Sequence, residues 1–78
     1  MKKSDVNKFE RAVKHLEQAY VLLDQIDDSL WKQPTEWIHL QGGEITTMRI
    51  ATDVRLDVHA VRTFAKARLK ILKETLND

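Results

Sequence analysis

The chain of 78 residues is long enough for one domain, contains no cysteine, and has a formal net charge of +1. A domain of this length, folding alone, buries only about 60% of the surface of its unfolded chain, and without cysteine neither a disulfide nor a thiolate metal site can add stability. With 42% hydrophobic and 32% charged residues, two glycines and one proline, the composition excludes a disordered segment and indicates helices stabilised by tight packing or by oligomerisation.

The first residues are charged and are not followed by an apolar segment of the kind found in signal peptides. No run of about 18 apolar residues is present, so we expect no membrane-spanning helix. The lack of cysteine favours a cytoplasmic location. We therefore predict a single domain over residues 1–78 that has no contact with a membrane.

An apolar stripe with alternating spacings of three and four residues predicts a first helix over residues 5–31, with Ser4 or Asp5 as its N-cap. The stripe consists of Val6, Phe9, Val13, Leu16, Tyr20, Leu23, Asp27 and Leu30, and Ala12, Ala19 and Ile26 lie beside it. Its width is that of a bundle helix rather than of a narrow coiled-coil seam. Where the helix should end, Asp27 or Asp28 is expected to cap a last separate turn.

The segment after Pro34, a residue that makes continuation of the first helix unfavourable, can be interpreted in two ways. Two stretches over residues 36–41 and 44–50 flank Gly42-Gly43, a dipeptide suited to the positive φ angles of a two-residue hairpin turn. The resulting β-hairpin would place Glu36 opposite Arg49, Trp37 opposite Met48, Ile38 opposite Thr47 and Leu40 opposite Ile45. The alternative is a helix that begins at Glu44.

The second helix is predicted over residues 53–76, with Thr52 or Asp53 as its N-cap, although a strand reaching into the high fifties also fits the local alternation. Its main stripe is expected at Val54, Val58, Val61, Ala65, Leu69, Leu72 and Leu76. The predicted fold is thus mainly α, with two long antiparallel amphipathic helices joined by a short β-hairpin (α-ββ-α). An all-α helical hairpin that forms a bundle by dimerisation is the alternative.

A second apolar line follows the predicted second helix, well round from the main stripe. It comprises Leu56, Ala60, Phe64, Ala67 and Ile71. One helix cannot bury two separate stripes against a single partner helix, so either the hairpin or another subunit covers this line. The two alanines would allow backbones to approach closely in a homodimer. We favour the homodimer, because a four-helix core would offset the small size of the chain.

A continuous line of basic residues lies between these two stripes. Its members are Arg55, His59, Arg62, Lys66, Lys70 and Lys73. Such a line can follow the phosphates of a nucleic acid or bind an acidic protein partner. An ordinary solvated helix face gives the same pattern, because Lys and Arg are common there and favour helix C-termini. No recognisable motif for reading DNA bases accompanies the line.

Trp31 and Trp37 flank Pro34, and two tryptophans are unusual in so small a chain. Residues of this kind most often close the end of a core. If they are partly exposed, they instead form a hot spot for a partner beside the acidic corner of Asp24, Asp27 and Asp28.

The sequence contains no convincing metal, cofactor or catalytic motif. Glu36 and His39 have the Glu-x-x-His spacing used in di-iron bundles, but such sites need several more inward-facing carboxylates, and His15 and His59 lie off the apolar stripes. Ser4 and Ser29 have no motif that places a general base beside them. We therefore predict a non-catalytic, oligomeric protein-interaction or regulatory module without metal or cofactor. A nucleic-acid-binding regulator that uses the basic line is the alternative.

Overall fold

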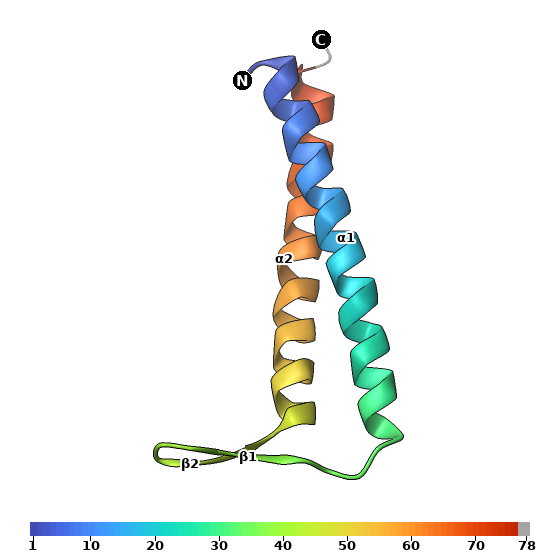
Figure 1. Cartoon of the computed structure of the whole chain (residues 1–78). Helices are drawn as coiled ribbons and strands as arrows, with labels where there is room; N and C mark the ends of the chain where they lie inside the picture. Colours follow the sequence, from blue (N-terminus) through green and yellow to red (C-terminus); the bar gives the residue numbers. More distant parts are fainter. Residues whose placement is uncertain (77–78) are drawn as a thin grey trace.

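The computed structural model describes residues 1–76, which form two long helices joined by a two-stranded β-hairpin (Figure 1). In chain order the elements are helix α1 (Lys3–Trp31), strand β1 (Trp37–Leu40), strand β2 (Gly43–Thr46) and helix α2 (Thr47–Leu76). This order confirms the predicted α-ββ-α fold. Asn77 and Asp78, which the predicted domain includes, lie outside the described residues.

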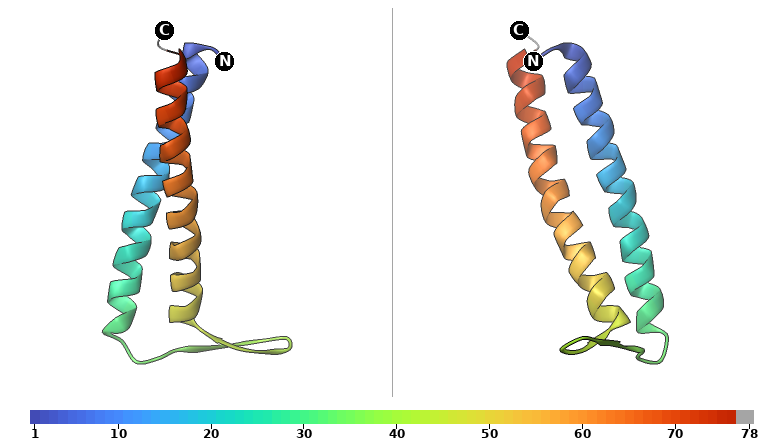
Figure 2. Two further views of the ribbon diagram at one scale, coloured as in Figure 1. Left: turned by 180° about the vertical axis from the view of Figure 1, so that it is seen from behind. Right: turned by 60° about the vertical axis from the view of Figure 1, so that its left-hand side comes forward.

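The helices run antiparallel, and the start of α1 lies beside the end of α2 at the open end of the helix pair (Figure 2). The molecule measures 54 × 28 × 16 Å, and its radius of gyration is 17.2 Å, whereas a compact domain of this length has roughly 11–12 Å. The β-hairpin lies across the closed end, below the start of α2 (Figure 1). Within the described residues, each helix is therefore covered along its length only by the other helix.

Helix α1 begins at Lys3, earlier than the predicted residue 5, and its N-cap is not one of the two predicted residues. Lys2 is the N-cap residue, and Oδ2 of Asp5 accepts a hydrogen bond from the backbone N–H of Lys2 at 3.1 Å. An acidic side chain in the first turn also interacts favourably with the helix dipole. Neither Ser4 nor Asp5 is the cap, and both lie inside the helix.

Helix α1 also continues without interruption to Trp31, with Lys32 as its C-cap. The prediction that Asp27 or Asp28 starts a separate turn is therefore wrong. Asp27 is instead the one buried polar residue among residues 1–76, with 8% of its surface exposed. Its carboxylate has partners on α2, which are described below.

The β-hairpin forms with a register two residues away from the predicted one. The observed pairs are Trp37 with Thr46, Ile38 with Ile45, His39 with Glu44 and Leu40 with Gly43. The two-residue loop is therefore Gln41-Gly42, and Gly42 alone has a positive φ angle, 97°. A positive φ at the third residue of the four-residue turn is what a type II turn requires, so a single glycine is sufficient and Gly43 joins the strand.

Helix α2 starts at Thr47, before either predicted N-cap, Thr52 or Asp53. Oγ1 of Thr46 accepts a hydrogen bond from the backbone N–H of Arg49 at 3.0 Å, which satisfies one of the free donors of the first helical turn. The predicted strand over residues 44–50 is consequently too long. The alternative of a helix from Glu44 is wrong as well, because residues 43–46 are paired in the sheet.

The predicted stripe of α2 is confirmed at Ala65 and Leu69, which are buried against α1, but toward the closed end the packed face is turned by about one residue from it. Val61 is 53% exposed and Val54 is also exposed, whereas the side chains of Arg55 and Arg62 are only 23% and 17% exposed. The physical reason is that α1 presents carboxylates at this level, and arginine gains ion pairs there that valine cannot form. A fully apolar core forms only near the open end, from Val6, Val13, Ala65 and Leu69 with Phe9 and Leu16 packed against them.

Candidate functional site

One long edge of the helix pair is held together by ion pairs between the helices. Nζ of Lys73 lies 3.0 Å from Oε1 of Glu10, and Nζ of Lys66 lies 2.8 Å from Oε1 of Glu17. All four residues follow a residue of the helix–helix contact by four positions, which places them on the same side of that contact. We call this set, Glu10 and Glu17 of α1 with Lys66 and Lys73 of α2, the ion-paired edge.

The lysine partners of the ion-paired edge favour the charged form of both glutamates. A hydrogen bond from Lys73, together with its positive charge, holds the pKa of Glu10 below its ordinary value. The pKa of Glu17 is lowered first by the hydrogen bond from Lys66 and further by the charge of Arg62, against an opposing effect of desolvation. Both carboxylates therefore stay ionised to lower pH than a free glutamate.

Arg62 joins the two helices at mid-length. Its Nη1 donates a hydrogen bond to Oε2 of Glu17 at 3.1 Å, and its guanidinium carbon lies 3.9 Å from the centre of the Tyr20 ring. Nη2 of Arg62 is 2.8 Å from Nδ1 of His59, and since arginine is always a donor, Nδ1 accepts. The guanidinium is thus bound inside the molecule through both terminal nitrogens, while its buried Nε has no hydrogen-bond partner among the described residues.

A second polar cluster joins the helices near the closed end, around Asp27. Oδ1 of Asp27 accepts a hydrogen bond from Oγ1 of Thr52 at 2.8 Å, and its Oδ2 lies 3.1 Å from Nε of Arg55. Nη1 of Arg55 also lies 3.8 Å from Oδ1 of Asp24. This cluster was not predicted from the sequence, although an aspartate inside the apolar stripe of α1 was the signal that a basic partner must face it.

The structure therefore places most of the predicted basic line in contact with α1. Arg55, Arg62, Lys66 and Lys73 all form ion pairs with its carboxylates, and His59 is bonded to Arg62. Of the six, only His59 and Lys70 have no ion pair with any of the described residues. Phosphates would have to compete with these carboxylates for Arg55, Arg62, Lys66 and Lys73.

The predicted second apolar line, in contrast, is uncovered in the single chain. Leu56, Ala60, Phe64, Ala67 and Ile71 are all exposed, and Phe64 has 61% of its surface open to solvent. The alternative in which the hairpin covers this line is wrong, because the strands contact only the beginning of α2 (Figure 2).

A continuous apolar surface extends from this line toward α1, on the side opposite the ion-paired edge. Ile26, Val54 and Val61 each come directly before a residue of the helix–helix contact, which turns them about 100° away from the neighbouring helix. They lie on the other side of that contact from the ion-paired residues. We call the exposed residues of this side the apolar edge: Leu22 and Ile26 of α1, and Ile50, Val54, Val61, Phe64 and Ile71 of α2.

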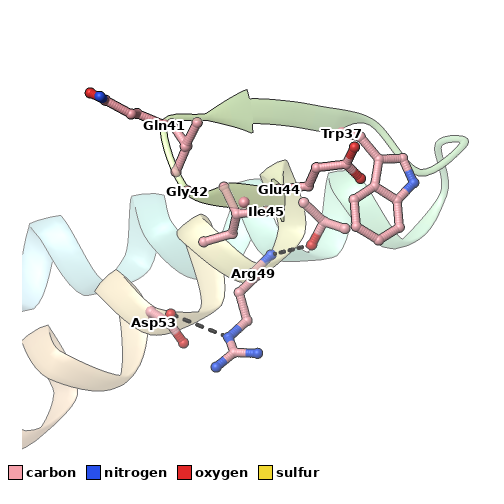
Figure 3. A pocket seen from close by; sticks show the side chains of 10 residues that line it. Trp37, Gln41, Gly42, Glu44, Ile45, Arg49 and Asp53 are labelled. Atoms are coloured by element: carbon pink, nitrogen blue, oxygen red, sulfur yellow. Dashed lines mark hydrogen bonds and ion pairs between the residues drawn. The ribbon is translucent and has the colours of Figure 1, made fainter.

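The closed end carries the two tryptophans, and neither of them closes a core. Trp31 is 73% exposed and Trp37 is 58% exposed, so the structure has the exposed arrangement rather than the capping one. Trp37 borders an open hollow between the β-hairpin and the first turns of α2, which Ile45, Arg49 and Asp53 also line (Figure 3). Nε of Arg49 lies 3.5 Å from Oδ2 of Asp53, so this charge is already paired.

The predicted Glu36 and His39 pair does not lie in a cluster of metal ligands. Nδ1 of His39 is 3.0 Å from Oε1 of Glu44 across the hairpin. Among residues 1–76, no group of three or more histidine and carboxylate side chains is placed to hold a metal ion. Neither of the two described helices is sufficiently long and apolar to cross a bilayer.

Comparison of the chain with protein-family models, with curated proteins and with solved structures finds no match. The function is therefore argued from the surfaces described above.

Proposed function

We propose that the protein is a non-catalytic protein-interaction module that works as a homodimer. The amount of exposed surface is the observation that carries this proposal. The chain exposes 6230 Å², whereas a folded monomer of 9.1 kDa is expected to expose about 4,900 Å². The difference, roughly 1,300 Å², exceeds the approximately 800 Å² that each partner buries in a standard protein–protein interface.

The composition of the exposed surface supports the same proposal. Only four hydrophobic residues among the described ones are buried, while large apolar side chains of both helices are open to solvent. The predicted second apolar line and the apolar edge share Phe64 and Ile71, so together they form one broad surface. A contiguous surface of this kind marks a site of protein–protein contact, and a second copy would complete a four-helix core.

Sedimentation equilibrium of the wild type and of Phe64→Asp tests the proposal. We expect a dimer for the wild type and a monomer for Phe64→Asp, because a buried, unpaired carboxylate is incompatible with an apolar interface. Gln18→Asp, the same charge at an exposed position of α1 outside this surface, is the control and should remain dimeric. Circular dichroism of each variant verifies the helical fold. The proposal would be overturned if the wild type remained monomeric at concentrations above about 100 μM, because a dissociation constant of that size is weak for an obligate dimer.

Trp31 and Trp37 would serve as the contact for a further protein partner, which is the regulatory part of the proposal. Both side chains are exposed at the closed end, outside the apolar edge. Exposed tryptophans are the residue type most often found as hot spots. A regulatory partner would then bind the closed end without separating the two subunits.

A nucleic-acid-binding regulator is the second candidate function, and one observation favours it. Residues 1–17 and 62–76, which form the open half, contain ten basic and four acidic side chains. Fluorescence anisotropy with labelled duplex and single-stranded DNA and RNA tests this candidate, since phosphate contacts give an affinity that falls steeply with salt. The absence of binding at low salt would exclude it.

A further inference from the structure

We infer that the second copy lies antiparallel to the first, with the closed end of each copy beside the open end of the other. This inference rests on the proposed homodimer and specifies its orientation. Two features carry it: the opposite charges of the two ends, and the positions of the apolar residues along α2.

The two ends of the helix pair have opposite charge. Dividing both helices at mid-length, the closed half (residues 18–61) contains seven acidic and three basic side chains, and the open half (residues 1–17 and 62–76) contains ten basic and four acidic ones. The formal charges of the halves are thus −4 and +6. Two copies packed in parallel would bring like charges together at both ends, whereas the antiparallel arrangement places each acidic end beside a basic one.

The ion pairs within the chain do not remove this asymmetry. The inter-helix pairs involve Arg55, Arg62, Lys66 and Lys73, each with a carboxylate of α1 in its own half. Arg55 contacts the two carboxylates of Asp24 and Asp27, whereas Arg62 and Lys66 share Glu17, so these contacts leave excess negative charge at the closed end and excess positive charge at the open end. The free charges on the outer surface therefore determine which orientation of a second copy is favourable.

The apolar residues on the outer side of α2 are also arranged as a two-fold axis requires. Ile50 and Ile71 lie almost equally far from Val61, on either side of it, and Val61 itself is near the middle of the helix. A two-fold axis perpendicular to α2 near Val61 would bring Ile50 of one copy against Ile71 of the other, as in an isologous interface. The apolar residues then match along the length of the contact.

Single-cysteine variants measure this orientation directly, because the natural chain has no cysteine. Ile50→Cys and Ile71→Cys are oxidised separately and after mixing and subunit exchange. The antiparallel dimer predicts a covalent dimer in the mixture, at least tenfold more than in either variant alone. Val61→Cys, beside the axis and exposed in the single chain, should form a covalent dimer by itself, and Gln18→Cys, on an exposed part of α1, is the control that should not.

The outcomes separate the orientation from the existence of the dimer. Sedimentation of each reduced variant first shows whether the dimer is present. A dimer in which Ile71→Cys crosslinks to itself, and not to Ile50→Cys, would overturn the antiparallel arrangement while leaving the proposed function intact. A monomer would overturn both.

The salt dependence of dimerisation is a second measurement. The affinity of the antiparallel dimer should fall at least threefold between about 0.05 M and 0.5 M NaCl, because salt screens the attraction between the oppositely charged ends. Strengthening over this range would contradict it.

Discussion

The two halves of the helix pair are built in opposite ways. Near the open end the contact between the helices is apolar, with Val13 and Leu69 at its centre, and the outer surface is rich in lysine and arginine. Near the closed end the contact contains Asp27 and Arg55, while apolar residues such as Ile26 and Val54 are exposed. Hydrophobic burial stabilises the first half within one chain, whereas the second half has charges inside and apolar surface outside.

This difference shows how a short sequence can fold and still retain surface for a partner. A hydrophobic contact is non-directional and would accept several partners. The charged contact at the closed end has partners that must meet at defined atoms, so it selects one alignment of α1 and α2. The apolar residues that do not enter this contact stay free for association.

The largest expected effect comes from breaking the apolar core of the open half. Leu69→Ala should lower the free energy of unfolding by about 2–4 kcal/mol, because it removes a buried side chain from a core of few residues. Leu76→Ala, the same change at an exposed position of the same helix, should cost less than about 1 kcal/mol. Urea titrations followed by circular dichroism measure both. Equal losses would show that the open half is not the stabilising core.

The next effect tests the charged contact of the closed half. Asp27→Leu should destabilise the fold by about 2 kcal/mol, because it leaves Arg55 and the Thr52 hydroxyl without their partner. The double variant Asp27→Leu/Arg55→Leu should recover most of this loss, since a well-packed apolar pair can replace a buried ion pair. Thermal unfolding of the four proteins in this cycle gives the coupling energy. Additive losses would mean that the two residues act independently.

A smaller effect is expected at the turn of the β-hairpin. Gly42→Ala should weaken the hairpin by about 1 kcal/mol, because an L-residue is strained at a φ of 97°. Gly43→Ala has no such angle and open space around the added methyl group, so it should be close to neutral. The intensity of NMR cross-strand contacts between His39 and Glu44 reports hairpin formation. A stronger loss in Gly43→Ala would contradict the observed register.

The smallest effect is the pH dependence of the ion-paired edge. The pKa of Glu17 is below its ordinary value of 4.5 in the folded chain, so its contribution to stability is complete above about pH 4.5 and is lost as the pH falls through the lowered folded pKa. Glu17→Gln should therefore lose less stability than the wild type on acidification below pH 4.5. Glu36→Gln, which removes a carboxylate without an ion pair among the described residues, is the control. The midpoint of thermal unfolding against pH measures both.

The succession of elements could be predicted from the sequence, but their exact junctions could not. The stripe of α1 and the turn glycines are local signals, and they gave the correct helix, hairpin and helix. Two hydrogen bonds set the boundary between β2 and α2. The backbone N–H of Arg49 donates to Oγ1 of Thr46, and the backbone N–H of Thr47 donates to the carbonyl oxygen of Glu36. Threonine side chains suit both a strand and a helix cap, so the sequence favoured a longer strand.

The candidate site could be predicted only in part, because the spacing of apolar residues is visible in the sequence and the partners of the charged residues are not. The exposed line through Phe64 and Ile71 was identified from spacing alone, because a helix with apolar residues on two sides cannot bury both against one neighbour. The roles of Arg55 and Arg62 were not identified, because periodicity shows which residues share a face but does not show whether a charge on that face has a partner. Asp27 and Glu17, distant in the sequence, supply those partners.

The sequence by itself determined two antiparallel amphipathic helices, a turn between them and more apolar surface than one helix pair can bury. These properties depend on the periodicity and the φ preferences of neighbouring residues, which act locally. The tertiary structure alone decided which face of α2 meets α1, because ion pairs such as Asp27 with Arg55 form only when both helices are in place. That choice turned Val54 and Val61 outward and so determined which surface remains free for a second copy.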